Sequence, residues 1–176
     1  MNDDHAVLEE TAALLNSLRG VFDGEEVDEL AHALQSASHA IADGGDDELV
    51  LASALHDLAR SPLLEGADGV PHDVVAREWL TSRFGHRVGW LAGAHVVAKR
   101  FLVATDPAYA EGLSTESIAT LRRQGGAGVD TAYVSHPWWP DAVRLRRYDD
   151  RAKVPGAPTV SVDEVLEVAR RVGVAR

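Results

Sequence analysis

Residues 47–59 read DELVLASALHDLA, and this stretch decides the fold. Apolar residues fill almost every position before the pair His56-Asp57, and a helix that is apolar on nearly all sides is usually buried. A carboxylate there costs several kcal/mol unless a cation or a hydrogen-bond network neutralises it. The segment therefore predicts a central buried helix whose last residues hold a metal ion, although an isolated His-Asp pair is more often a helix end facing water.

Helical periodicity continues on both sides of this segment, with apolar residues three and four positions apart. The expected helices span residues 5–18, 26–42, 47–59, 72–84, 86–104, 115–124, 139–152 and 162–172. Ser114 and Ser161 are predicted N-caps, because a hydroxyl can accept a hydrogen bond from a free N–H of the first helical turn. Ser161 and Glu164 also match the spacing of a capping box.

Strand signals are weak throughout the chain. Residues 129–134 are the only strand candidate, and this stretch is short. Residues 61–71, rich in Gly and Pro, and the stretch around Pro107 are predicted loops. We therefore expect an all-α protein.

Composition narrows the possible functions. The 176 residues suit one domain, and the absence of cysteine excludes disulfides, thiolate metal sites and cysteine nucleophiles. A formal net charge of −11 argues against a nucleic-acid partner, while the basic stretch 144–153 could still bind a small anionic substrate. The acidic N-terminus carries no secretory signal, and no run approaches the ~18 apolar residues that span a bilayer. We expect a soluble, cytoplasmic protein without a membrane partner.

Other imidazoles and carboxylates accompany the His-Asp pair. His32 lies in a helix among small residues, His72 opens a helix, His95 lies in an apolar segment, and Asp149 follows a basic run. Imidazole and carboxylate without thiolate suit Fe, Mn, Co, Ni or Zn. Each residue also has an ordinary interpretation: a satisfied core histidine, a helix start, or a surface pair of Asp149 with Lys153. His95 is the hardest to explain in this way, because a buried imidazole needs partners for both ring nitrogens.

The order His, His-Asp, His, His, Asp resembles the HD-domain superfamily. More specifically, the chain is similar to the HD-domain mixed-valent diiron oxygenases, which include 2-amino-1-hydroxyethylphosphonate dioxygenase and, more distantly, myo-inositol oxygenase. The matching stretches are residues 29–37, 54–58, 94–102, 113–117, 120–126 and 145–153. The segments around His95 and Gln124 are the most specific. The resemblance implies a single HD-domain helical bundle over residues 1–176, with its metal-site core at about 22–156 and a C-terminal helix at about 161–173.

This resemblance also implies the metal ligands. Asp57 would bridge two irons in a mixed-valent Fe(II)/Fe(III) pair, and the remaining ligands would be His32, His56 and Asp149 on one iron and His72 and His95 on the other. Asp149 is preferred to Asp150 because the family ligand lies four residues before a lysine, here Lys153. The implied reaction uses O2 to cleave a C–P or C–C bond of a small hydroxylated anion, with an organophosphonate as the expected substrate.

Substrate contacts follow from the same resemblance. Lys99 lies one helical turn after His95 and on the same face, so its ammonium group can reach an anionic group near the metal. Ser117, Thr120 and Gln124 should contact that group too, and their spacing of i, i+3 and i+7 places them on one helical face. A polar stripe facing solvent is the ordinary interpretation of that pattern.

Two positions depart from the family pattern. Where the phosphonate enzymes carry Tyr-x-Gly-Glu, this chain has Phe22-Asp23-Gly24-Glu25. Glu25 is retained and joins Asp57 and Lys99 as a predicted catalytic residue, but the phenylalanine cannot bind a metal. A family histidine three residues after the HD aspartate is replaced by Arg60, which can bind an anion with two donors. Arg60 is therefore a predicted substrate-binding residue, and the substrate is expected to differ in its head group or beyond it.

Two other functions use a similar fold. An HD-type metal-dependent phosphohydrolase would need one metal with His32, His56, Asp57 and Asp149, and a ligand-sensing or scaffold HD domain would need none. The additional residues His72, His95 and Lys99 favour the oxygenase. The oligomeric state, monomer or homodimer, stays open at this point.

Overall fold

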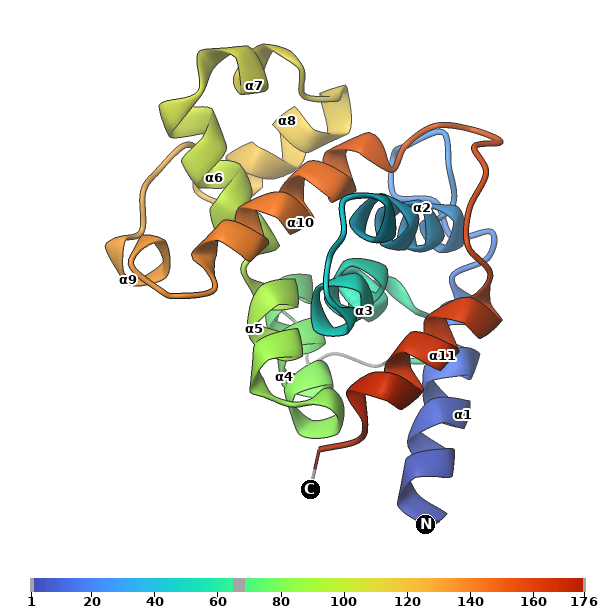
Figure 1. Cartoon of the computed structure of the whole chain (residues 1–176). Helices are drawn as coiled ribbons and strands as arrows, with labels where there is room; N and C mark the ends of the chain where they lie inside the picture. Colours follow the sequence, from blue (N-terminus) through green and yellow to red (C-terminus); the bar gives the residue numbers. More distant parts are fainter. Residues whose placement is uncertain (1, 65–68, 176) are drawn as a thin grey trace.

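Helices form every regular element in the part of the chain that the computed structural model describes, residues 2–64 and 69–175 (Figure 1). They are α1 (Asn2–Ser17), α2 (Glu29–Ala42), α3 (Asp47–Leu55), η1 (Leu58–Arg60, a 3₁₀ turn), α4 (His72–Phe84), α5 (His86–Gly93), α6 (His95–Thr105), α7 (Pro107–Glu111), α8 (Thr115–Arg123), α9 (Thr131–Val134), α10 (Trp139–Arg151) and α11 (Val162–Val172). The predicted all-α class is confirmed. None of these helices has the length and apolar character needed to cross a membrane.

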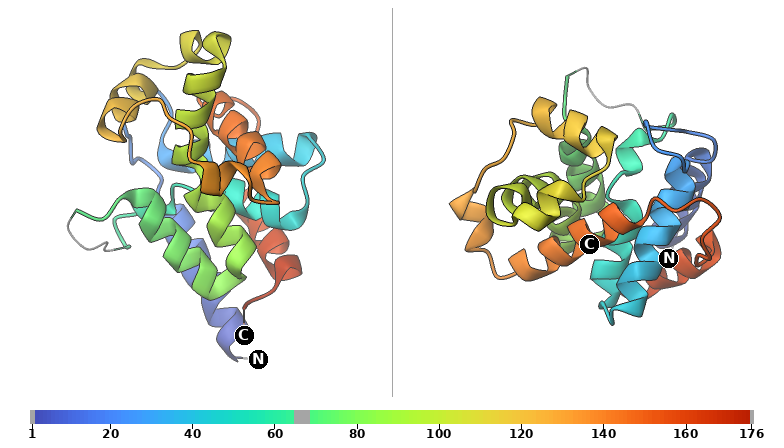
Figure 2. Two further views of the ribbon diagram at one scale, coloured as in Figure 1. Left: turned by 90° about the vertical axis from the view of Figure 1, so that its left-hand side faces the viewer. Right: turned by 90° about the horizontal axis from the view of Figure 1, so that it is seen from above.

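Helix α3 is the centre of the core, as its sequence predicts. All its side chains from Leu49 to Leu55 are buried, and helices α2, α5, α10 and α11 pack around it (Figures 1 and 2). Burying each large apolar side chain contributes about 1.5–3 kcal/mol. The carboxylate of Asp46 caps the helix start by accepting a hydrogen bond from the backbone N–H of Leu49 at 2.9 Å.

The predicted end of this helix was wrong by four residues. The α-helix stops at Leu55, and the pair His56-Asp57 lies in the turn that leads into η1. Helix α2 likewise starts at Glu29 rather than at residue 26, because the Asp28 side chain accepts a hydrogen bond from Ala31 N–H at 2.8 Å and caps the helix there.

The predicted helix 86–104 is two helices, α5 and α6, with a break at Ala94. The break makes His95 the first residue of a new helix rather than a mid-helix residue. The caps at Ser114 and Ser161 are confirmed, including the capping box with Glu164. The break at Ala94 contains no Pro, and the periodic apolar pattern alone does not reveal such a break.

Two other local predictions were wrong. The weak strand candidate at 129–134 contains a short helix, α9, instead, and the Asp130 side chain caps it by accepting a hydrogen bond from the backbone N–H of Ala132. Pro107 lies in the first turn of α7, where its missing N–H would have no helical partner in any case. Of the loop expected at 61–71, residues 65–68 lie outside the described residues.

Helices α4 and α5 form the closest helix pair, and together they position two histidines. Helix α4 begins at His72, and α5 leads directly into His95. Gly89 permits this approach: a Cβ atom there would lie 2.0 Å from Thr81 Oγ1 and 2.6 Å from the carbonyl oxygen of Arg77. The separation of α4 and α5 therefore depends on the absence of a side chain at Gly89.

Replacing Gly89 with Ala should destabilise the protein by about 1–3 kcal/mol, because the added methyl group meets backbone atoms that cannot move independently. The midpoint of urea unfolding measures the change. Gly112→Ala is the matched control, since its Cβ atom would meet nothing closer than 3.6 Å. Equal midpoints for the two variants would show that α4 and α5 can separate at no cost.

Candidate metal centre and substrate pocket

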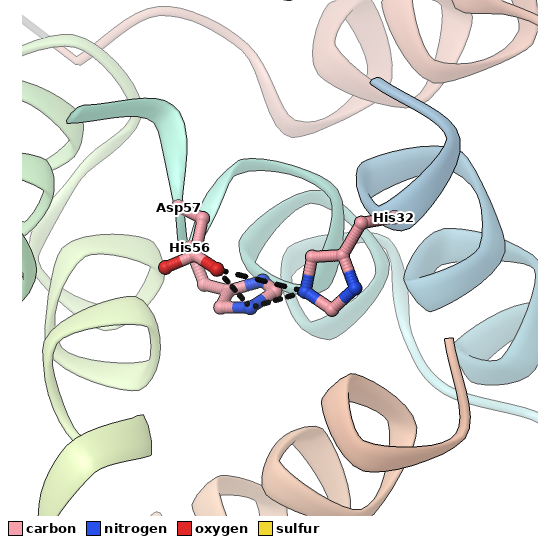
Figure 3. Close-up of side chains that lie close together, drawn as sticks. All are labelled: His32, His56 and Asp57. Atoms are coloured by element: carbon pink, nitrogen blue, oxygen red, sulfur yellow. Dashed lines mark hydrogen bonds and ion pairs between the residues drawn. The ribbon is translucent and has the colours of Figure 1, made fainter. Parts of the chain in front are cut away.

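The fold brings the six predicted metal ligands together from separate helices. They are His32 in α2, His56 and Asp57 after α3, His72 at the start of α4, His95 at the start of α6 and Asp149 in the last turn of α10. Figure 3 shows the first three, with both imidazole rings and the carboxylate pointing toward one another. Two groups have ligand atoms close enough to one another to hold a metal ion: His32, His56 and Asp57, and Asp57, His72 and His95.

The first group gathers two imidazoles and two carboxylates. Nε2 of His32 lies 3.3 Å from Nε2 of His56. Oδ2 of Asp57 lies 3.5 Å and 3.3 Å from these two nitrogens, and the carboxylate oxygens of Asp149 lie 3.5 Å and 3.6 Å from them. Potential ligand atoms of four side chains from distant parts of the chain therefore face one small volume.

The second group lies on the other side of Asp57. Nε2 of His72 and Nε2 of His95 are 3.2 Å apart, and Oδ1 of Asp57 lies 3.3 Å and 3.6 Å from them. One carboxylate oxygen of Asp57 thus faces each histidine pair, so this single side chain joins the two groups.

The protonation of the first group shows that a cation fits it. Nδ1 of His32 lies 2.9 Å from the carbonyl oxygen of Ala152, and Nδ1 of His56 lies 2.8 Å from that of Ser53. A carbonyl only accepts, so each Nδ1 carries the hydrogen, and in the neutral ring each Nε2 is an unprotonated lone pair. The two lone pairs point at each other at 3.3 Å, which is repulsive unless a cation lies between them. Such backbone hydrogen bonds from the outer ring nitrogen are typical of metal-ligating histidines.

The second group also offers acceptor atoms that suit a cation. Nδ1 of His95 lies 2.5 Å from the carbonyl oxygen of Ala92, so its Nε2 is also left as an acceptor. Oδ1 of Asp57, which faces this group, is buried and accepts no hydrogen bond from the described residues. An acceptor nitrogen beside an unpaired carboxylate oxygen again suits a metal ion.

The charges of the site point the same way. Burial lowers the pKa of His56, but the charges of Asp57 and Asp149 outweigh it and raise that pKa well above the usual value. The pKa of His32 is raised in the same manner. For His95, burial and the charge of His56 lower the pKa to about 3. The two carboxylates therefore require positive charge nearby, and a bound metal ion can supply it in place of imidazole protons.

Arg146 is a residue of the site that the sequence analysis missed. It is buried and donates a hydrogen bond to Oδ2 of Asp149 at 2.6 Å, and it also pairs with Asp150. Asp150 turns the other way and accepts a hydrogen bond from the Tyr109 hydroxyl at 2.6 Å. Of the two adjacent aspartates, only Asp149 is therefore near the histidines. The spacing of three residues between Arg146 and Asp149 was the sequence signal that could have identified Arg146 as part of the site.

A pocket of about 60 Å³ opens beside these groups. It is lined by the five predicted substrate-binding residues, Arg60, Lys99, Ser117, Thr120 and Gln124, and by every predicted metal ligand except His56. Lys99 is 2 % exposed and donates a hydrogen bond to Thr120 Oγ1 at 2.8 Å. Burial, with the charge of Arg146, lowers the pKa of Lys99 to about 8. The polar face predicted for residues 117–124 lines this pocket rather than facing open solvent.

Glu25 lies in the loop before α2 and lines the same pocket. Its Oε1 accepts hydrogen bonds from Lys153 Nζ at 2.8 Å and from Ser114 Oγ at 2.6 Å. Burial raises the pKa of Glu25, but these two hydrogen bonds outweigh it and leave the pKa below its usual value. Lys153 is thus the partner of Glu25 and not, as the ordinary interpretation had it, of Asp149. Phe22, which replaces the family tyrosine, is 62 % exposed.

Glu29 is the second residue that the sequence analysis missed. It lies one turn before His32, lines the pocket and is only 7 % exposed. Its Oε2 is buried without a hydrogen-bond partner among the described residues. Burial, with the charge of Asp57, raises the pKa of Glu29 to about 7. The spacing of three residues from His32 could have indicated its place.

Comparison with known proteins identifies the family of the chain. No family model matches the chain. It is 33 % identical over 153 residues to hydroxymethylphosphonate dioxygenase of Gimesia maris, which covers 81 % of this chain and 76 % of that protein. It is 30 % identical over 157 residues to the glycine-betaine-forming 1-hydroxy-2-(trimethylamino)ethylphosphonate dioxygenase of Leisingera caerulea, covering 80 % of each. With these relatives and an all-helical fold, the chain belongs to the HD-domain phosphonate dioxygenase-like family.

Proposed function

We propose that this protein is a non-heme diiron oxygenase that uses O2 to cleave the C–P bond of a small 1-hydroxyphosphonate. The observation that carries the proposal is the division of Asp57 between two histidine pairs, one carboxylate oxygen to each. A site for one metal ion would not need the second pair. The two relatives named as phosphonate dioxygenases support the reaction class.

In this proposal the ligands divide as the resemblance implies. Asp57 would be a ligand shared by both irons, His32, His56 and Asp149 would hold one of them, and His72 and His95 would hold the other. A bound ferrous–ferric pair would supply dioxygen activation and Lewis acidity. The overall change is balanced by one O2: the hydroxyl-bearing carbon becomes a carboxylate, and the phosphonate group leaves as phosphate.

The residues around the metal ligands bind and orient the substrate. Lys99 is a buried cation whose neighbours Thr120 and Ser117 offer only neutral oxygen atoms, so its charge is available to a phosphonate. A charge in a site with little water acts more strongly than at the surface. Arg146 has a different task, because it holds Asp149 in place through the hydrogen bond at 2.6 Å.

The phosphohydrolase alternative needs only the first group and Asp149. It gives His72 and His95 no role, although their Nε2 atoms lie 3.2 Å apart and face Asp57. The number and identity of the bound metal ions therefore separate the two functions.

Asp57→Ala should abolish binding of both metal ions, because the variant removes the one ligand that the two groups share. Metal analysis of protein purified without oxygen, with low-temperature EPR after partial oxidation, makes the measurement. Asp163→Ala is the control, since Asp163 is exposed on α11. Two irons in the Asp57 variant would refute the bridging role. A single zinc, manganese or nickel ion in the natural protein, with phosphatase activity on nucleotides, would favour the hydrolase.

Lys99→Met should lower kcat/KM for a 1-hydroxyphosphonate by about 10–100-fold, the effect of losing one hydrogen bond to a charged group. The iron content should not change, because Lys99 is not a proposed ligand. Oxygen consumption and phosphate release give the rate, and metal analysis is the control. Loss of iron in this variant would instead assign Lys99 a structural role.

The rate should also depend on the charge of Lys99. The pKa of this ammonium is lowered to about 8, so the charged form is present below that pH and is lost as the pH rises. We expect kcat/KM to fall as the pH rises through about 8, since this parameter reports groups of the free enzyme. In Lys99→Arg, which stays charged, the fall should disappear from this range. An unchanged profile in that variant would assign the pH dependence to another group.

A further inference from the structure

Four side-chain atoms of pocket-lining residues are buried without a hydrogen-bond partner among the described residues; besides Oδ1 of Asp57 and Oε1 of Gln124, they are one atom of Glu29 and one of Arg60. Oε2 of Glu29 is a buried acceptor without a donor, and Nε of Arg60 is a buried donor without an acceptor, among the residues that the structure describes. Both residues line the pocket beside the metal ligands, and the charge of Arg60 acts on the Glu29 carboxyl group. A buried polar atom without a partner costs about 1–3 kcal/mol, so a bound group that completes both bonds is favoured.

The other acids of this wall already have cationic partners. Asp23 accepts from Arg60 Nη2 at 2.8 Å, and Glu25 accepts from Lys153 at 2.8 Å. Because Asp23 takes up only one end of the Arg60 guanidinium group, the Nε–H remains free. Glu29 therefore differs from its acidic neighbours in having neither a hydrogen bond nor an ion pair within the described residues.

We infer that Glu29 and Arg60 form a specificity pair that binds a second hydroxyl group of the substrate, next to the carbon that is oxidised. This inference rests on the proposed function and narrows the substrate class to phosphonates with hydroxyl groups on adjacent carbons. Lys99, on α6, is the anchor for the phosphonate group. Arg60, on η1, and Glu29, on α2, supply the pair from two other elements.

The chemistry of the two atoms selects the hydroxyl group. The ligand group must accept a hydrogen bond from Arg60 Nε–H and donate one to Glu29 Oε2. A hydroxyl does both, whereas an ammonium group has no lone pair and a carboxylate has no hydrogen. A methyl group does neither and would leave both protein atoms unpaired. A site built for a hydroxyl rejects analogues without it, because its own polar groups are then left buried and unsatisfied.

The test compares three substrates on the iron-loaded full-length enzyme. They are 1,2-dihydroxyethylphosphonate, 1-hydroxyethylphosphonate and 2-amino-1-hydroxyethylphosphonate, which differ only in the group on the second carbon. We expect kcat/KM for the dihydroxy compound to exceed that of each of the others by about 10–100-fold, from two added hydrogen bonds. Calorimetry without oxygen should show the same order of Kd values, which separates binding from turnover.

Variants of Glu29 and Arg60 then test whether these two side chains produce the preference for the dihydroxy compound. Glu29→Leu and Arg60→Met should each bring the ratio of the dihydroxy to the 1-hydroxyethyl compound close to one, while Glu29→Gln, which keeps an acceptor, should keep part of it. Glu26→Leu is the matched control, because Glu26 is exposed in the loop before α2 and should leave the ratio unchanged. Glu29→Leu should also raise Tm by about 2–4 °C, since it removes an unpaired buried carboxyl group, whereas a structural role would lower it.

The possible outcomes test the specificity pair and the proposed function separately. A natural enzyme that prefers the amino or the methyl compound overturns the specificity pair, as does a dihydroxy preference that survives in Glu29→Leu and Arg60→Met. If none of the three phosphonates is oxidised, the proposed function fails. Tighter anaerobic binding of the dihydroxy compound, lost in those two variants, would still support the pair.

Discussion

The negative charge of Asp57, whose side chain is only 18 % exposed, is the constraint on which the rest of the site depends. Its carboxylate follows the most deeply buried helix, and both of its oxygens face imidazole nitrogens rather than water. A charge in this position is stable only when opposite charge lies beside it. Four histidines surround it, and Asp149, held by Arg146, adds a second carboxylate to the first group. The site is therefore a set of ligand atoms whose repulsion a cation relieves.

Helix ends orient these ligand atoms. The last carbonyl groups of a helix have no partner within it, and three histidines use such groups. Ser53 lies in the last turn of α3, Ala92 in the last turn of α5, and Ala152 follows α10; each accepts a hydrogen bond from a histidine Nδ1. The early end of α3 and the break between α5 and α6 thus serve the site, because a continued helix would use these carbonyls itself.

This role of helix ends explains what the sequence could and could not predict. Apolar periodicity and capping residues were enough for the all-α class, for the buried helix that starts at Asp47 but not for its end at Leu55, and for the cap at Ser161. The break at Ala94 was not predicted, because no Pro marks it and the apolar pattern continues through it. The predicted ligands lie together as the order of His and Asp suggested, and their roles remain proposals.

Residues whose importance arises only from burial were the ones missed. Glu29 and Arg146 look like ordinary charged helix residues in the sequence, and only their spacing of three residues from His32 and Asp149 indicates that their side chains turn inward. Arg60 and Glu25 could be placed near the pocket from the resemblance, but their partners, Asp23 and Lys153, could not. Long-range pairing of this kind depends on tertiary contacts rather than on local preference.

The spread of the proposed ligands along the chain has a mechanical consequence. They run from residue 32 to residue 149 and belong to five separate segments of a protein that has no cysteine. Bound ions would therefore do what disulfides do in other small proteins: they would cross-link segments that are distant in sequence and restrict the unfolded chain. Catalytic competence and resistance to proteolysis would then be acquired in one event, when the apoprotein first takes up its metal.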